Sequence, residues 1–314
     1  MPIERNIAAL LSLIANAGYP PIAEGTVEQA RRGIRALFVD LRQPATLPEV
    51  GSISDGAAAG VPVRVYRPAA SGPAPTVVYL HGGGWVIGDL DTADPVCRLL
   101  CRDVGAVVVS VDYRRAPEDH FPAAVDDSWA AVQWVAAHIE DYGADATRVA
   151  VAGDSAGANL ATVCAQQAAA AGIPLAAQLL VYPPVDLLGE YPSRTDPANG
   201  GLMTLADMRW AAELYLGMSE DDPRAAELAR DPRLSPLLAP SLADLAPAVV
   251  VTAEFDPLRD EGNAYARALE KAGVRVEHRE FAGLVHGFYG LDMFSAAVVE
   301  AMTWSNERFK ELLG

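Results

Sequence analysis

From about residue 61 onward, the sequence alternates between short apolar runs and longer stretches with helical periodicity. The run 61–67 alternates apolar and polar residues, as a half-exposed antiparallel strand does. The segment 274–281 carries charges at its outward positions, which is typical of an edge strand. Continuously apolar runs, which predict strands of a parallel sheet buried on both faces, lie at 76–80, 106–111, 148–153, 176–182 and 248–253.

Stretches with helical periodicity separate these predicted strands. They cover residues 93–104, 122–139, 156–171, 260–272 and 291–312. Regular alternation of strands and helices predicts an α/β fold, in which helices flank both faces of a mostly parallel, twisted sheet.

Two further helical segments have no place in this alternation. Residues 1–45 contain two amphipathic helices. A second segment, about 186–230 with a helical pattern at 204–217, interrupts the link between the predicted strands at 176–182 and 248–253. We predict that both segments form a helical cap, or lid, on a catalytic domain that spans residues 46–314. The apolar stripe of the first helix consists of Ile3, Ile7, Leu10, Leu11 and Ile14.

The charge balance excludes several kinds of partner. The chain has 24 Lys and Arg against 41 Asp and Glu, a formal net charge of −17. Nucleic acid is not expected as a partner, because phosphate binding needs clustered basic residues. No apolar run reaches the length of a membrane span, so no integral membrane association is expected.

Several features favour a cytoplasmic protein. The apolar stretch 7–17 follows Glu4 and Arg5, one acid and one base, instead of the positive region of a signal peptide. The three cysteines, Cys97, Cys101 and Cys164, form no CxxC pair and suggest no disulfide framework.

Residues 153–157 read Gly-Asp-Ser-Ala-Gly and match the Gly-x-Ser-x-Gly pattern of a nucleophile elbow. The pattern alone is weak, but here it follows a predicted buried strand and opens a predicted helix. Glycines at both ends allow the sharp turn that holds Ser155 in a strained backbone at the end of the sheet. A serine that only caps the helix is the alternative; the context favours a catalytic nucleophile.

A run of three glycines, residues 82–84, follows His81 and the strand at 76–80. Backbone N–H groups without side chains suit a developing oxyanion, so we expect Gly82, Gly83 and Ala156 to form the oxyanion hole. A dinucleotide-binding motif would need glycine at Ile87, and no Walker lysine follows.

The base and the acid are predicted from their order along the chain. His286 lies just after the last predicted strand, where a loop can bend back to the serine. Asp256 follows the strand at 248–253, between serine and histidine, as in the α/β-hydrolase order. Glu254 is the reserve candidate for the acid, whereas Asp260 opens the next helix, where an acid interacts favourably with the helix dipole.

Together these motifs resemble those of the hormone-sensitive-lipase family of α/β-hydrolases, the bacterial family IV carboxylesterases. The resemblance runs from about residue 60 to the C-terminus. Arg115 departs from it, since the family usually has leucine there. The matching motifs are HGGGW, DYRRAPEDHFPAAVDD (112–127), GDSAG, DPLRDE and HGF.

This resemblance implies the α/β-hydrolase fold with a helical cap, and hydrolysis of short- to medium-chain acyl esters through an acyl-enzyme. It implies no metal and no organic cofactor, and a small-molecule ester as partner. A lactonase, amidase or thioesterase with the same triad stays open, as does a small-molecule receptor without catalysis. A homodimer also stays open. Candidate pocket residues, for which core packing is an equal alternative, are Phe38, Trp85, Met203, Trp210 and Leu284.

Overall fold

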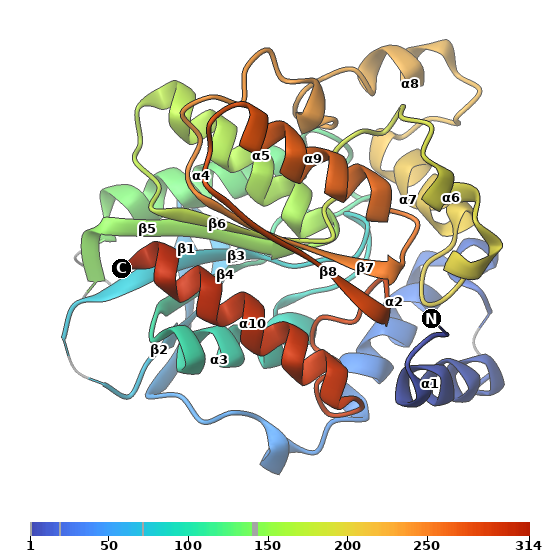
Figure 1. The fold of residues 1–314 in the computed structure, drawn as a ribbon, viewed down its shortest axis with the longest axis horizontal. Helices are drawn as coiled ribbons and strands as arrows, with labels where there is room; N and C mark the ends of the chain where they lie inside the picture. The colour runs from blue at the N-terminus through green and yellow to red at the C-terminus, as the bar shows by residue number, and fades with distance from the viewer. Residues whose placement is uncertain (1, 19, 71, 140–143) are drawn as a thin grey trace.

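The computed structural model describes residues 2–18, 20–70, 72–139 and 144–314, so residues 1 and 19 of the predicted cap segment lie outside it. Within these residues, eight strands form one twisted sheet in the order β1-β2-β4-β3-β5-β6-β7-β8 (Figure 1). All neighbouring pairs from β4 to β8 are parallel, which confirms the predicted α/β fold. The strands are β1 (Ser52–Ala58), β2 (Val61–Arg67), β3 (Ala74–Leu80), β4 (Val107–Val111), β5 (Ala144–Asp154), β6 (Ala177–Val181), β7 (Ala248–Phe255) and β8 (Val276–Val285).

Helices cover both faces of the sheet, because each apolar strand presents side chains to both sides. α4, α5 and α9 contribute to the core on one face, whereas α3 and α10 pack together on the other (Figure 1). The helices are α1 (Arg5–Asn16), α2 (Val27–Arg35), α3 (Leu90–Val104), α4 (Ala123–Ala137), α5 (Ala156–Ala171), α6 (Pro192–Thr195), α7 (Leu205–Leu216), α8 (Pro223–Leu228), α9 (Arg259–Lys271) and α10 (Ala296–Leu313). None of the helices in the described residues is both long and apolar enough to cross a membrane.

The first strand was not predicted. β1 pairs with β2 as an antiparallel hairpin, and its two-residue turn at Ala59 and Gly60 has positive φ angles of 52° and 85°. Its residues are exposed except Ala58, so the strand has no apolar run from which it could be recognised. As predicted, β8 lies at the opposite edge.

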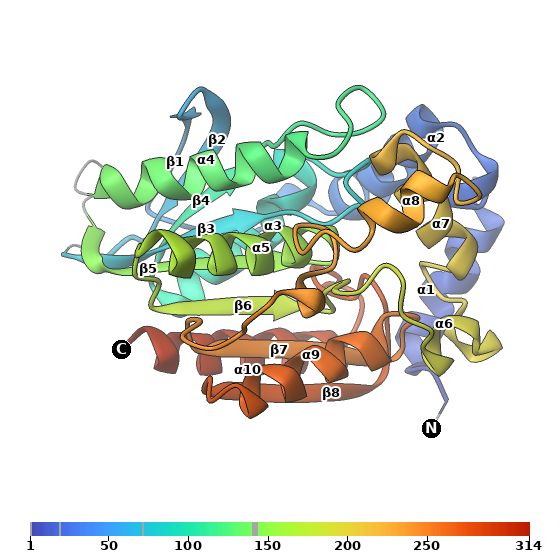
Figure 2. The ribbon, with the colours of Figure 1, turned by 90° about the horizontal axis from the view of Figure 1, so that it is seen from above.

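The two segments outside the alternation lie together at one end of the sheet. α1, α2, α6 and α7 all lie at this end of the molecule in both views (Figures 1 and 2). A hydrogen bond of 2.9 Å joins them, from Ala23 N, between α1 and α2, to Asp207 Oδ1 in α7. The predicted stripe of α1 faces inward: Ile7 and Leu10 are buried, and its other members pack partly buried on the same core.

Candidate active site

The nucleophile elbow is a tight turn between β5 and α5. Ser155 has φ 52° and ψ −126°, a strained conformation for a residue with a side chain. A Cβ on Gly153 would lie 2.4 Å from the backbone of Gly157, and one on Gly157 would lie 1.9 Å from Leu80 O. Only glycine fits at either position, so the close packing of strand, turn and helix fixes the serine at the carboxyl end of the sheet.

Three predicted site residues meet in one chain of hydrogen bonds. Ser155 Oγ lies 2.9 Å from His286 Nε2, and His286 Nδ1 lies 2.9 Å from Asp256 Oδ2. The second oxygen of Asp256 accepts a hydrogen bond of 2.7 Å from Leu258 N. Because the carboxylate only accepts, His286 Nδ1 carries the proton and Nε2 is left to accept one from Ser155.

The other two acids considered for this role are engaged elsewhere. Glu254 Oε2 accepts from Gly283 N at 2.7 Å. Asp260 Oδ2 accepts from Ser193 N at 2.9 Å, and its other oxygen pairs with Arg259. Only Asp256 therefore faces the imidazole among the three acids.

The glycine loop corrects one predicted residue of the oxyanion hole. Gly82 N donates to Asp154 Oδ1 at 3.0 Å, so its N–H does not meet the prediction of a free donor. Gly84, which was not predicted, lines the cavity above Ser155. Among the described residues, no group accepts a hydrogen bond from the N–H of Gly83, Gly84 or Ala156. These three N–H groups are the ones available to an oxyanion.

Two polar residues, Asp154 and His81, support the glycine loop through hydrogen bonds. Asp154 accepts from Tyr79 Oη at 2.6 Å as well as from Gly82 N, and burial raises the pKa of its carboxyl group. The ring of His81 stacks on Tyr113 with centroids 4.3 Å apart, and its Nδ1 lies 2.8 Å from Gly82 O. Burial lowers the pKa of His81 to about 4, so this histidine is neutral and structural at ordinary pH.

A cavity of about 710 Å³ opens over Ser155 and Ala156. Of the predicted pocket residues, Trp85 and Met203 line it. The other three do not: Leu284 is fully buried, and Phe38 and Trp210 pack against the core. Most of the further apolar lining comes from the predicted insertion, through Leu187, Leu188, Leu205, Met208, Leu216 and Met218.

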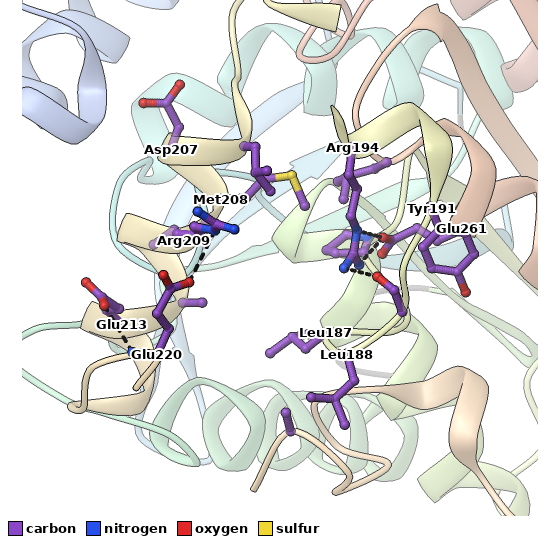
Figure 3. Close-up of a pocket in the computed structure, with 18 of the residues that line it drawn as sticks. Leu187, Leu188, Tyr191, Arg194, Asp207, Met208, Arg209, Glu213, Glu220 and Glu261 are labelled. Carbon is purple, nitrogen blue, oxygen red and sulfur yellow. Dashed lines mark hydrogen bonds and ion pairs between the residues drawn. The ribbon is translucent and has the colours of Figure 1, made fainter. Parts of the chain in front are cut away.

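A buried ion pair forms one wall of this cavity. Arg194 Nε donates to Glu261 Oε2 at 3.0 Å, and Glu261 Oε1 accepts from Val185 N at 2.8 Å (Figure 3). Burial raises the pKa of Glu261 to about 7, although Arg194 opposes the shift. No sequence pattern linked Glu261 to an arginine 67 residues away. Across the cavity, Arg209 of α7 forms an ion pair of 3.2 Å with Glu220, which lies in the turn after this helix (Figure 3).

The sequence of this chain is similar to those of known proteins. A family described as "alpha/beta hydrolase fold" matches residues 77–290. The chain is 45% identical to carboxylic ester hydrolase LipN of Mycobacterium tuberculosis over 83% of this chain and 70% of that protein. It is 42% identical to ethyl acetate hydrolase of Pseudomonas putida over 73% of this chain and 71% of that protein.

A solved structure extends the likeness to the whole chain. The crystal structure of a thermostable esterase from Pseudomonas putida matches with a TM-score of 0.90 and 37% identity, over 100% of this chain and 98% of that one. The fold and site define an α/β hydrolase. Within that class, the chain belongs to the hormone-sensitive-lipase-like family.

Proposed function

We propose that the protein is a serine carboxylesterase that hydrolyses short- to medium-chain acyl esters. The observation that carries the proposal is the hydrogen-bonded chain Ser155–His286–Asp256 beneath an apolar cavity. The related proteins named carboxylic ester hydrolase and ethyl acetate hydrolase support the same reaction class.

Each residue of the site has a role in this reaction. His286 Nε2 removes the proton from Ser155 Oγ, which attacks the ester carbonyl and forms a tetrahedral intermediate. Asp256 holds the tautomer of the imidazole and stabilises its cation. The N–H groups of Gly83, Gly84 and Ala156 bind the oxyanion. The alcohol leaves with the proton from His286, and water then releases the acid.

A chain-length series of p-nitrophenyl esters tests this function. We expect the highest kcat/KM for short to medium acyl chains. Thioesters, anilides and lactones of matched size separate the esterase from a thioesterase, an amidase or a lactonase. The proposal fails if the pure protein hydrolyses no oxygen ester, or if one of these other substrates has the higher kcat/KM.

We also propose that residues 1–45 and about 186–230 act as a cap on the catalytic domain 46–314. Support comes from the insertion, whose side chains form much of the cavity lining. No described residue of 1–45 lines the cavity, so this segment would act by supporting α7 through the contact between Ala23 and Asp207. We further propose a cytoplasmic location, with the three buried, unpaired cysteines as support.

Deletion of residues 1–40 should lower ester turnover and increase the binding of a hydrophobic dye. Ile7 and Leu10 leave the core in this variant, and the surface that they cover becomes accessible. Steady-state kinetics and dye fluorescence measure the two effects. A soluble truncation with wild-type turnover and no added dye binding would refute the role of the segment.

A further inference from the structure

The loop that carries the oxyanion N–H groups has little internal support. We call residues 82–88 the oxyanion loop. Gly83, Gly84, Trp85 and Gly88 all have positive φ angles, of 121°, 59°, 60° and 85°. Within the loop, the N–H groups of Val86 and Ile87 both donate to Gly83 O. Trp85 is strained at a positive φ, whereas the three glycines can adopt many other conformations, so contacts from outside the loop set the direction of these peptide groups.

Arg31 of α2 makes such contacts from the N-terminal segment. Its Nε donates to Val86 O at 3.0 Å, and one terminal nitrogen donates to Ala116 O at 3.1 Å. Ala116 N in turn donates to Trp85 O at 2.9 Å. One guanidinium therefore connects the oxyanion loop with the loop after β4, and these two loops are also connected directly.

The carboxylate of Glu118 holds the guanidinium in this orientation. Its two oxygens lie 2.6 and 2.7 Å from the terminal nitrogens of Arg31, a bidentate pair. The side chain of Arg31 is 27% exposed, and that of Glu118 is 58% exposed. The ion pair itself contributes little to stability at such exposure, so its main consequence is the fixed direction of the donors toward the two carbonyls.

We propose that Arg31 is a positioning residue for ester hydrolysis. It fixes the oxyanion loop through Val86 O and Ala116 O, so that Gly83 N–H and Gly84 N–H point to the oxyanion. The proposal rests on the proposed function. None of the described residues of 1–45 lines the cavity, and Arg31 connects this segment to the transition state through the backbone of the oxyanion loop.

The central test is Arg31→Met, which keeps an unbranched apolar stem and removes all donors. We expect kcat to fall by roughly tenfold to a hundredfold, because small displacements of preorganised donors have effects of this size. KM should change by less than about threefold, since the ground-state ester does not need the oxyanion hole. Titration of active sites with diethyl p-nitrophenyl phosphate gives kcat per competent serine and removes any effect of partial unfolding.

A second readout reports on the oxyanion alone. A trifluoromethyl ketone forms a tetrahedral adduct with the serine. The oxygen of this adduct accepts hydrogen bonds from the same N–H groups as the oxyanion of the reaction. Its inhibition constant should rise by about the factor by which kcat/KM falls. A variant that only loses packing would have a lower melting temperature, but its inhibition constant and its kcat/KM would not change by the same factor.

Two variants provide the controls. Arg35 lies one turn further along α2 and pairs with Asp91 at 2.9 Å and with Asp89 at 3.8 Å. Arg35→Met therefore removes ion pairs of the same helix and removes no hydrogen bond to residues 82–88. We expect wild-type kcat for it. Arg31→Lys keeps the charge but cannot reach both carbonyls and the carboxylate, so its kcat should lie between those of wild type and Arg31→Met.

The outcomes separate the two proposals. If the wild type hydrolyses no ester, the proposed function fails and this one with it. If the wild type is active and Arg31→Met has wild-type kcat per active site, only the role of Arg31 is overturned. An equal loss in Arg35→Met also overturns it. If Arg31→Met does not fold, Arg31→Lys decides, and wild-type kcat in that variant overturns the proposal.

Discussion

Replacing Ser155 by alanine should abolish ester hydrolysis and leave the fold intact. Its hydroxyl bonds His286 Nε2 at 2.9 Å, and the backbone strain of the elbow is the same for serine and alanine, since both carry a Cβ. Loss of a triad nucleophile lowers kcat by about 10⁴–10⁶. Steady-state kinetics with p-nitrophenyl butyrate and a thermal melt measure the two expectations.

A buried serine elsewhere in the chain provides the control. Ser128 is fully buried on α4, where its Oγ donates to Ala124 O at 2.7 Å. Ser128→Ala should therefore keep wild-type turnover. More than a tenth of wild-type activity in a pure sample of Ser155→Ala would contradict the assignment of the nucleophile.

Those parts of the fold that carry a repeating apolar pattern could be predicted from the sequence. The central strands are continuous apolar runs, and α5 begins and ends at its predicted residues, 156 and 171. β1 could not be predicted, because its sequence, with Asp55 and Gly56, lacks an apolar face and is held by pairing with β2. Such a strand forms because its backbone pairs with that of the neighbouring strand, and its residue types do not indicate a strand.

The active site, too, could be predicted only in part from the sequence. Ser155, Asp256 and His286 were found from chain order and from the ends of predicted strands, which topology brings to one edge. Whether Gly82 or Gly84 contributes an N–H group to the oxyanion hole depends on one side chain, because Asp154 accepts a hydrogen bond from Gly82 N. No spacing rule reports which N–H of a glycine run stays free.

Three of the five predicted pocket residues, Phe38, Trp210 and Leu284, do not line the cavity, for a related reason. An apolar residue next to a strand end, such as Leu284, can belong either to a pocket or to the core, and in the structure Leu284 is buried in the core. The residues that line the cavity come mostly from about 186–230, a segment whose path over the sheet does not follow from local periodicity. The pair Arg194–Glu261 joins this segment to α9 and so to the turn that carries Asp256.

Asp256→Asn should lower kcat by roughly 10³–10⁴ with little change in KM, because ground-state binding does not use the acid. Both carboxylate oxygens accept hydrogen bonds, one from His286 Nδ1 and one from Leu258 N. If the new amide turns its NH₂ to the imidazole, it favours the tautomer with the proton on Nε2, which cannot accept from Ser155. If the NH₂ turns to Leu258 N instead, two donors face each other in a buried site. In either orientation, the imidazolium loses its counter-charge.

The neighbouring acids are the matched controls for this variant. Glu254→Gln and Asp260→Asn remove the same charge, but these side chains bond Gly283 N, Ser193 N and Arg259 instead of the imidazole. Each should cost less than about tenfold in kcat, since neither changes the tautomer of His286. The three variants are assayed side by side, with thermal melts to confirm folding. If Glu254→Gln proves to be the inactive one and Asp256→Asn turns over normally, the acid of the triad lies two residues earlier, and the contact between Asp256 and His286 is structural.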